Sequence, residues 1–557
     1  MTTKLANVYL LILIIVIAAS LRLINLGKVP NGFSDDEAAF GYNAYSILKT
    51  GTDEWGKFLP LTTFRSFGDY KLPVYFYLTA ASIPFFGLTE FATRFPTAIF
   101  GVFSVIATYF LVKKLFDEKI ALLAALLLTI SPFHIFVSRH ALESAVPIFF
   151  NLTAVIFFLK SFKQKKAIFV SALLFAINLY VYRSTWIFVP VYFCALFVLF
   201  KQEIKKNLKN SFFAVLLFLL LSAPIAVTAA SPSGTSRLRQ IGITSEFNMI
   251  GLVNDVNYQR SVCQKNMPST ICKLAYNKYS AVAVKYISNY ISHFSPQLLF
   301  ISGSQDGEQM LKGRGFLYFI ELPFIIFAII YLGKNLKSVQ TRILLPWLLV
   351  YPLASASSGF ETPGRQAIGM PIFEMLTAIG FFIFIRYISK IKFKIFAPAI
   401  TLLLAITLFF EFGRFLIDYF VIYPKTSEKE FRYGYKELFT YLKAQENAYD
   451  QFVISNKIDQ SHQYIQQLFF QKIDPKSIQK QVYFDRHINA DGWVVVTRIG
   501  NYNYHESVPN ISNYPSKTLI AVTKGEITTP VAPNYTIKYS NGDEVFDIYD
   551  LSKLQSR

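Results

Sequence analysis

Long apolar stretches separated by short polar loops dominate the chain. Runs of about 17 to 25 apolar residues are long enough to cross a bilayer as helices. Such runs lie at 7–24, 94–112, 119–137, 144–160, 167–182, 185–200, 211–230, 315–332, 342–358, 369–386 and 395–420. The pattern predicts an α-helical polytopic membrane protein with about 11 transmembrane helices.

The charge of the short loops predicts the orientation of these helices. Lys and Arg gather in alternate loops, for example at 160–166 and 201–209, and such clusters are retained on the cytoplasmic side. We therefore expect a plasma-membrane protein with a cytoplasmic N-terminus and with residues 421–557 outside. The first run could also be a cleaved signal peptide, although an uncleaved anchor is favoured. In both cases the following loop lies outside.

A further apolar segment, from Leu72 to Leu88, could be a twelfth crossing. A crossing here would place the later lysine-rich loops outside, against the charge rule. We therefore interpret it as an interfacial helix on the outer surface. Residues 1–420 are accordingly predicted to form one transmembrane domain with two large outer loops, 25–93 and 231–314.

The last part of the chain has a different pattern. A helix is expected near 435–445, and short runs rich in β-branched residues follow at 452–454, 493–497 and 518–522. Such runs are typical of strands. The pattern predicts that residues 421–557 form a small extracytoplasmic α/β domain.

Composition narrows the class of protein. Of 557 residues, 53% are hydrophobic and 16% charged, which is far more apolar than a soluble domain. The net charge of +20 is spread over loops between apolar runs, so we expect no nucleic-acid partner. Cys263 and Cys272 share one hydrophilic loop, and a disulfide between them is possible if that loop is extracytoplasmic. No spacing of Cys and His is typical of zinc.

Charged residues of both signs gather in the loops predicted to lie outside. They are Asp36, Glu37, Lys71, Arg94, Arg139, Glu143, Arg183 and Arg365. Transporters usually place their charges near the middle of the membrane, whereas the phosphate of a lipid-linked donor sits at headgroup depth. A carboxylate could act there as a general base, and cations could neutralise a departing phosphate. Asp53 and Glu54, in the same first loop, are expected to be solvated.

Several short motifs occur in a family-like order. They are Asp36-Glu37 before Ala38-Ala39-Phe40-Gly41-Tyr42, then Gly68-Asp69-Tyr70-Lys71-Leu72-Pro73, Arg94-Phe95-Pro96, Ser131-Pro132, and Arg139 through Glu143. This order resembles the membrane glycosyltransferases that use polyprenyl-phosphate sugars, the protein O-mannosyltransferase and aminoarabinose transferase group of the C-type superfamily. The resemblance covers roughly residues 1–420. Where that family usually has Lys-Pro-Pro-Leu, this chain has Lys71-Leu72-Pro73-Val74, with one proline missing.

The resemblance implies roles for individual residues. Asp36 would be the catalytic base, with Glu37 beside it. The donor phosphate would be bound by Lys71, Arg139 and Arg365. Glu143, Arg94 and His293 would support the acceptor or the structure, Arg94 as a partner of Asp36 or Glu37.

The resemblance also implies an activity. The chain would move a sugar from a polyprenyl-phosphate donor to an extracytoplasmic protein, lipid or glycan by an inverting displacement. The mannosyltransferase branch requires no metal, while other branches bind zinc or another divalent ion, so a divalent metal stays possible. Two alternatives stay open: a transporter or flippase of lipid-linked sugars, and a non-catalytic binding or assembly protein.

Overall fold

The protein divides into two compact units. The computed structural model describes residues 2–359, 362–389, 395, 397–458, 462–480, 483–489, 493–507 and 514–555. Residues 1–24 and 97–416 form the helical unit, and residues 25–96 and 417–557 form the sheet unit. The second boundary lies close to the predicted one at 420. Residues 25–96, which we expected to belong with the membrane helices, instead group with the C-terminal part of the chain.

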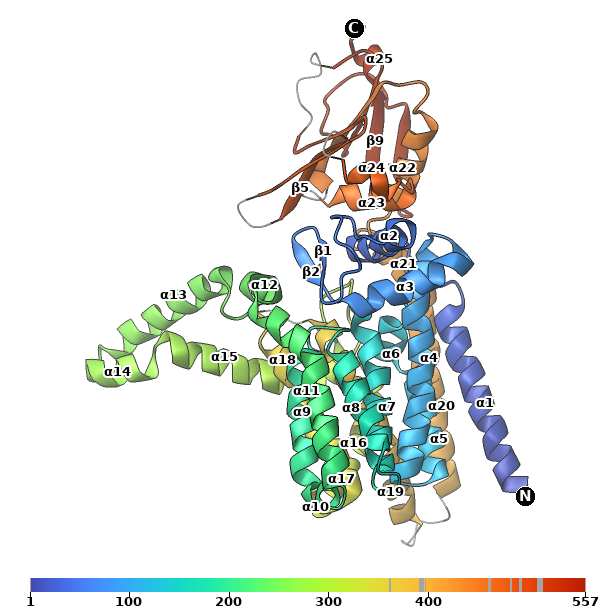
Figure 1. The fold of residues 1–557 in the computed structure, drawn as a ribbon, viewed down its shortest axis with the longest axis vertical. Helices are drawn as coiled ribbons and strands as arrows, with labels where there is room; N and C mark the ends of the chain where they lie inside the picture. Colours follow the sequence, from blue (N-terminus) through green and yellow to red (C-terminus); the bar gives the residue numbers. More distant parts are fainter. Residues whose placement is uncertain are drawn as a thin grey trace. The chain divides into compact units, whose positions relative to one another are not determined.

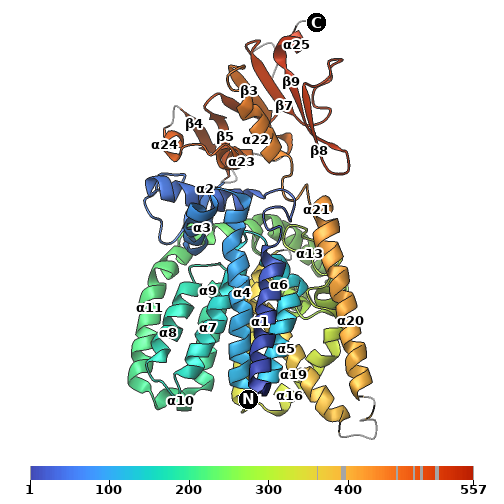
Figure 2. The same ribbon diagram turned by 90° about the vertical axis from the view of Figure 1, so that its right-hand side faces the viewer.

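The helical unit is built from long apolar helices. Its helices include α1 (Thr2–Leu23), α4 (Glu90–Leu115), α5 (Glu118–Ile130), α6 (Pro132–Val137), α7 (Val146–Lys160), α8 (Ala167–Asn178), α9 (Thr185–Leu199), α11 (Leu208–Ala230), α16 (Leu322–Lys334), α17 (Val339–Val350), α18 (Pro352–Ala356), α19 (Met370–Ile388) and α20 (Ala397–Ile417). The first residues of α4 and the last residue of α20 belong to the sheet unit. Figure 2 shows α7, α8 and α11 side by side. Each of the eleven predicted crossings overlaps at least one of these helices.

Six helical segments are long and apolar enough to cross a membrane. Within the described residues they are Lys4–Leu23, Glu90–Leu115, Glu143–Lys160, Leu208–Ala230, Pro363–Ile388 and Pro398–Thr426. Large apolar side chains on α20, such as Leu403 and Phe409, are exposed, as expected for residues that contact lipid. The structure therefore supports a multi-pass membrane protein, while the number of eleven crossings and the orientation stay predictions.

The loop predicted at 231–314 is mostly helical. It contains α12 (Pro232–Ile241), α13 (Glu246–Cys263), α14 (Ser269–Ala275) and α15 (Lys278–Ser292). Figure 1 shows α13, α14 and α15 as an arm that extends away from the other helices of the helical unit. A disulfide joins Cys263 at the end of α13 to Cys272 in α14, so the predicted pairing of these cysteines is confirmed.

The sheet unit contains the predicted α/β domain. Its strands are β3 (Gln451–Ser455), β4 (Phe484–Ile488), β5 (Val494–Ile499), β6 (Tyr502–His505), β7 (Thr518–Val522), β8 (Tyr535–Lys538) and β9 (Glu544–Asp550). They form one sheet in the order β4-β5-β6-β3-β7-β9-β8, in which β3 is parallel to β6 and β7 and the other pairs are antiparallel. The helix α22 (Tyr435–Ala444) and the three predicted strands are confirmed.

The first loop folds onto this domain. It supplies α2 (Asp35–Thr50), the antiparallel pair β1 (Phe64–Ser66) and β2 (Asp69–Lys71), and α3 (Pro73–Phe86). A Cβ added at Gly41 of α2 would lie 2.4 Å from the ring of Phe469 in α23 (Gln463–Phe470). The Val494 N–H donates to the Phe67 carbonyl. These contacts explain why the loop groups with the sheet.

The helix α3 covers only part of the segment proposed to be interfacial. It has 14 residues, so its length is about 21 Å, against a hydrocarbon core of about 30 Å. Pro73 occupies its first turn, where the missing N–H costs little. A helix of this length agrees with the interpretation that the segment does not cross the bilayer.

Close packing in the helical unit depends on a glycine. A Cβ added at Gly380 of α19 would lie 1.8 Å from the Phe324 carbonyl oxygen of α16. Small residues let helix backbones approach closely in membrane proteins. Gly333 of α16 has no atom within 4 Å of the same hypothetical Cβ.

We expect Gly380→Ala to destabilise the protein by about 1–3 kcal/mol, because the methyl group must push α16 away from α19. Gly333→Ala is the matched control and should be neutral or slightly stabilising, since alanine favours the helix. Thermal unfolding of both variants in detergent measures the difference. Equal midpoints for the two variants would contradict the close approach.

Candidate active site

Three adjacent acids, Asp35, Asp36 and Glu37, form the first turn of a helix of the sheet unit and are called the acid triad. The Ser34 side chain accepts a hydrogen bond from the Glu37 N–H, and the Glu37 carboxylate accepts one from the Ser34 N–H, which forms a capping box at the start of α2. Carboxylates in a first helical turn are stabilised by the positive end of the helix dipole. Local sequence therefore determines where Asp35, Asp36 and Glu37 stand on the helix.

Glu37 is bound by Arg94 in a buried ion pair. Arg94 Nε lies 2.7 Å from Glu37 Oε1 and Arg94 Nη2 lies 2.8 Å from Oε2. Both side chains are almost fully buried. Arg94 also donates to the carbonyls of Leu26, Pro30 and Gly32. The pair therefore holds the chain before α2 against the start of α4. Of the two partners expected for Arg94, Asp36 or Glu37, the structure pairs it with Glu37.

Asp35 also makes buried contacts that stabilise the sheet unit. Its Oδ2 lies 3.0 Å from Arg432 Nε, and its Oδ1 accepts a hydrogen bond of 2.8 Å from the Gln466 side chain. The residue is only 8% exposed. Asp35 thus ties α2 to the C-terminal part of the sheet unit.

Asp36 differs from both neighbours. Its side chain is 42% exposed, and its Oδ1 lies 2.5 Å from Lys71 Nζ, whose side chain is 6% exposed. The ammonium group lies 5.3 Å from the Phe40 ring centroid and 5.8 Å from that of Phe67, distances at which cation–π attraction is significant. The carboxylate is therefore accessible to solvent while its cationic partner is fixed beneath it.

His462 joins this group from the C-terminal part of the chain. It interacts electrostatically with Asp35, Asp36, Arg432 and Lys71. Burial lowers the pKa of His462, while the nearby carboxylates oppose that shift. Sequence reasoning missed this residue because no motif surrounds it and it lies far along the chain from Asp36.

The remaining predicted site residues belong to the helical unit. Arg139 is fully buried, and its guanidinium donates to the carbonyls of Leu21 and Ile24 at the end of α1. Glu143 begins a short 3₁₀ helix, η1 (Glu143–Ala145). Arg365 lies in η4 (Pro363–Gly369) and donates to the Ser358 hydroxyl. Their predicted roles toward phosphate and acceptor stay predictions.

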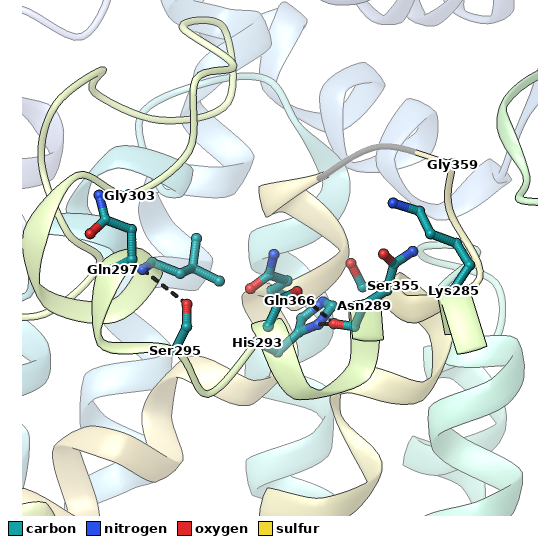
Figure 3. Close-up of a pocket in the computed structure, with 11 residues that line it drawn as sticks. Lys285, Asn289, His293, Ser295, Gln297, Gly303, Ser355, Gly359 and Gln366 are labelled. Atoms are coloured by element: carbon teal, nitrogen blue, oxygen red, sulfur yellow. Dashed lines mark hydrogen bonds between the residues drawn. The ribbon is translucent and has the colours of Figure 1, made fainter. Parts of the chain in front are cut away.

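His293 lies in a polar cavity of about 230 Å³ in the helical unit. The cavity is lined by residues near the end of α15, in the turn η2 (Gln297–Ile301), in α18 and in η4. Figure 3 shows His293, Gln366 and Asn289 gathered there, with Lys285 beside them. Within the described part of the chain, both amide atoms of Gln366 and Nε2 of His293 are buried without a hydrogen-bond partner. Each unsatisfied buried group costs about 1–3 kcal/mol.

The structure overturns the expectation that Asp53 and Glu54 are solvated. Their exposed fractions are 1% and 0%. Glu54 Oε1 accepts hydrogen bonds from the Tyr464 hydroxyl and the Trp55 indole N–H. Burial raises the pKa of Glu54 to about 7, partly offset by Arg486. The expectation failed because the sheet domain covers this loop, which hydropathy cannot show.

Metal ligands do not gather in the described residues. No group of three or more His, Cys, Asp or Glu side chains among them is placed to hold a metal ion. Binding of a divalent metal therefore stays a possibility that the sequence alone raises.

Comparison with known proteins identifies the fold. Residues 71–228 match the family model described as dolichyl-phosphate-mannose-protein mannosyltransferase. ArnT from Cupriavidus metallidurans, solved in the apo state, has a TM-score of 0.52 and 10% identity over 99% of each chain. The chain has the C-type glycosyltransferase fold. The resemblance stated from the sequence is thereby confirmed at the level of the fold.

Two further proteins are similar over smaller shares of their length. The oligosaccharyltransferase AglB from Archaeoglobus fulgidus, solved with an inhibitory peptide and a dolichol-phosphate, has a TM-score of 0.52 and 16% identity, covering 84% of this chain and 64% of AglB. The protein named "Putative mannosyltransferase YkcB" from Bacillus subtilis (strain 168) is 26% identical over 162 residues, 28% of this chain and 23% of that protein. The chain thus matches about a quarter of the length of YkcB and less than two thirds of the length of AglB.

Because Glu37 and Arg94 are buried together, Glu37→Gln should destabilise the protein by about 3–5 kcal/mol by leaving Arg94 uncompensated. The matched control is Glu118→Gln, which removes a partly exposed ion pair with Lys113 and should have little effect. Unfolding of the substrate-free protein measures both. An unchanged midpoint for Glu37→Gln would contradict the structural role of the pair.

Burial of Glu54 predicts a pH dependence of stability. The folded protein keeps this proton up to about pH 7, whereas the unfolded chain releases it near its ordinary pKa of 4.5. Between these values the folded state binds more protons, so stability falls as pH rises, by about 3 kcal/mol in total.

Thermal midpoints at pH 5 and pH 8 test this dependence. The midpoint of the unaltered protein should fall more than that of Glu54→Gln, which carries no titrating carboxyl group. Glu506→Gln, at an exposed position of the same unit, is the control and should behave like the unaltered protein. If Glu54→Gln keeps the full pH dependence, Glu54 is not its source.

Proposed function

We propose that this protein is a membrane glycosyltransferase that moves a sugar from a polyprenyl-phosphate donor to an extracytoplasmic acceptor by an inverting displacement. The observation that carries the proposal is the contrast within the acid triad. Asp35 and Glu37 are buried in structural ion pairs, whereas the Asp36 carboxylate is 42% exposed and lies 2.5 Å from the buried ammonium of Lys71. An accessible carboxylate beside a fixed cation suits a base next to a phosphate.

In the proposed reaction Asp36 is the general base. One oxygen of its carboxylate accepts the proton of an acceptor hydroxyl or amide as the acceptor atom attacks the anomeric carbon of the sugar. The bond from that carbon to the donor phosphate breaks, and its electron pair stays on the phosphate oxygen. Polyprenyl phosphate leaves, and the configuration at the anomeric carbon is inverted.

Lys71 would stabilise the departing phosphate. Its ammonium is held by aromatic rings and by Asp36, so little reorganisation is needed when charge grows on the leaving group. Arg365 is a second candidate for the phosphate. Arg139 is a weaker candidate, because two of its donors bind carbonyls at the end of α1.

The relatives support a lipid-phosphate donor. ArnT has also been solved bound to undecaprenyl phosphate, with a TM-score of 0.52 to this chain, and AglB was solved with a dolichol-phosphate. At 10% and 16% identity these likenesses concern the fold, so the donor class belongs to the proposal. The matches do not favour the transporter or flippase alternative.

Asp36→Asn should lower the rate of transfer about 10²–10⁴-fold, while donor binding persists. The experiment incubates purified full-length protein with a panel of polyprenyl-phosphate sugars and candidate acceptors. Mass spectrometry then identifies the donor consumed and the product that gains the sugar.

Asp35→Asn is the matched control. It removes the neighbouring carboxylate, so we expect a lower unfolding midpoint with transfer largely retained. Unchanged transfer in Asp36→Asn would refute Asp36 as the base. Consumption of no donor by folded protein across the panel would refute the transferase and favour transport.

A further inference from the structure

The arm formed by α13, α14 and α15 has almost no core of its own. Among its helical residues, all of which the structure describes, only Val256 of α13 and Cys272 of α14 are buried, and α15 has no buried residue. Monomeric soluble proteins rarely expose large apolar patches, and such patches mark contacts with another protein or with a membrane. The arm therefore needs a further surface to cover its apolar side chains.

One side of α15 carries exposed apolar residues. Val284, Ile287 and Ile291 are each more than half exposed, and their spacing of three and four residues places them on one face of the helix. Lys278 lies nine residues before Ile287, and nine residues turn a helix by about 180°. The lysine is thus on the opposite side. This arrangement makes α15 amphipathic, as are helices that lie in the plane of a membrane interface.

The tip of the arm, residues 267–275, is also apolar at its surface. Leu274 is 80% exposed, and Met267 and Ile271 are about half exposed. The disulfide between Cys263 and Cys272 ties α14 to the end of α13. These apolar side chains are therefore presented by a covalently closed turn.

The arm is attached where long helices of the helical unit end. The segment Leu208–Ala230, which is long and apolar enough to cross a membrane, is followed at once by α12. At the other end of the arm, the Tyr286 and Tyr290 hydroxyls donate to the carbonyls of Leu353 in α18 and Leu349 in α17. Figure 1 shows α15 running across the direction of α9 and α11. A helix that leaves a membrane-crossing helix sideways near its end lies close to the lipid headgroups.

The charge of the arm favours an anionic lipid surface. Lys273, Lys278 and Lys285 are exposed on α14 and α15, and these two helices contain no acidic residue. Both acidic residues of the arm, Glu246 and Asp255, lie on α13. Basic residues strengthen the binding of amphipathic helices to anionic lipids. The side of the arm formed by α14 and α15 therefore combines apolar surface with positive charge.

We propose that the apolar face of α15 and the tip of the arm lie on the membrane surface, on the side where α11 ends, with the lysines of α14 and α15 among anionic headgroups. The apolar side chains that the arm leaves exposed are then covered by lipid. This contact does not depend on the proposed reaction, because neither helix contains a residue assigned to it.

Spin labels on the full-length protein in lipid vesicles test the contact. The free Cys194 is replaced by serine, and one cysteine introduced at Leu274 or Ile287 carries the label. Relaxation by dissolved oxygen and by a water-soluble nickel chelate gives the depth of each label in the bilayer. We expect both labels about 5–10 Å into the boundary between headgroups and acyl chains.

Two further positions serve as matched controls. Lys278→Cys lies on the opposite side of α15 from Ile287, and Asn541→Cys lies at an exposed position of the sheet unit. Labels at both positions should be accessible to the nickel chelate. An unfolding midpoint equal to that of the unaltered protein shows that each labelled variant is folded.

Lipid composition tests the role of the lysines. Labels at Leu274 and Ile287 should lie deeper in vesicles of phosphatidylcholine with phosphatidylglycerol than in phosphatidylcholine alone. The double variant Lys273→Gln and Lys278→Gln should lose this difference. Lys517→Gln, at an exposed position of the sheet unit, removes a positive charge elsewhere and should keep it.

Three results would overturn the proposal or part of it. Labels at Leu274 and Ile287 that meet the nickel chelate as readily as a label at Asn541 would refute the lipid contact and leave the face to a protein partner. Spin–spin broadening between labels at Ile287 would show that a second copy of the chain covers the face, and would refute it equally. Equal depths with and without phosphatidylglycerol would refute the role of the lysines.

Discussion

The bidentate ion pair between Glu37 and Arg94 is the interaction on which the candidate site depends. Two opposite charges removed from water need excellent geometry and further hydrogen bonds to be tolerated. Both are present, since Arg94 also binds three carbonyls of the chain before α2 and Glu37 completes the capping box with Ser34. One pair thus holds the chain before α2 against the first turns of α4.

This anchoring explains how three adjacent acids acquire different roles. Successive residues on a helix point in directions about 100° apart, so neighbouring side chains cannot share one environment. Glu37 points to Arg94 and Asp35 to Arg432 and Gln466, both in buried surroundings. Asp36 is left at the surface beside Lys71. Because Asp35 and Glu37 are buried in structural ion pairs, Asp36 is the accessible carboxylate of the acid triad.

The sequence by itself determined the features that depend on local pattern. Apolar runs indicated the helices, β-branched runs indicated β3, β5 and β7, and the order of short motifs indicated the fold and made Asp36 the candidate base. The position of Cys263 and Cys272 in one loop made a disulfide between them possible, and the structure contains it. Each of these features depends on residues that are close together in the chain, or on the order of motifs along it.

Only the tertiary structure decided which residues are buried and which distant residues meet. Asp53 and Glu54 are polar by sequence, yet the sheet domain covers them, and residues 25–96 group with a domain that begins more than 300 residues later. His462 and Gln366 carry no local signal, because their significance comes from partners or cavities formed by other parts of the chain. Burial and long-range pairing depend on how elements pack, and hydropathy along one chain carries no information about the elements that will cover it.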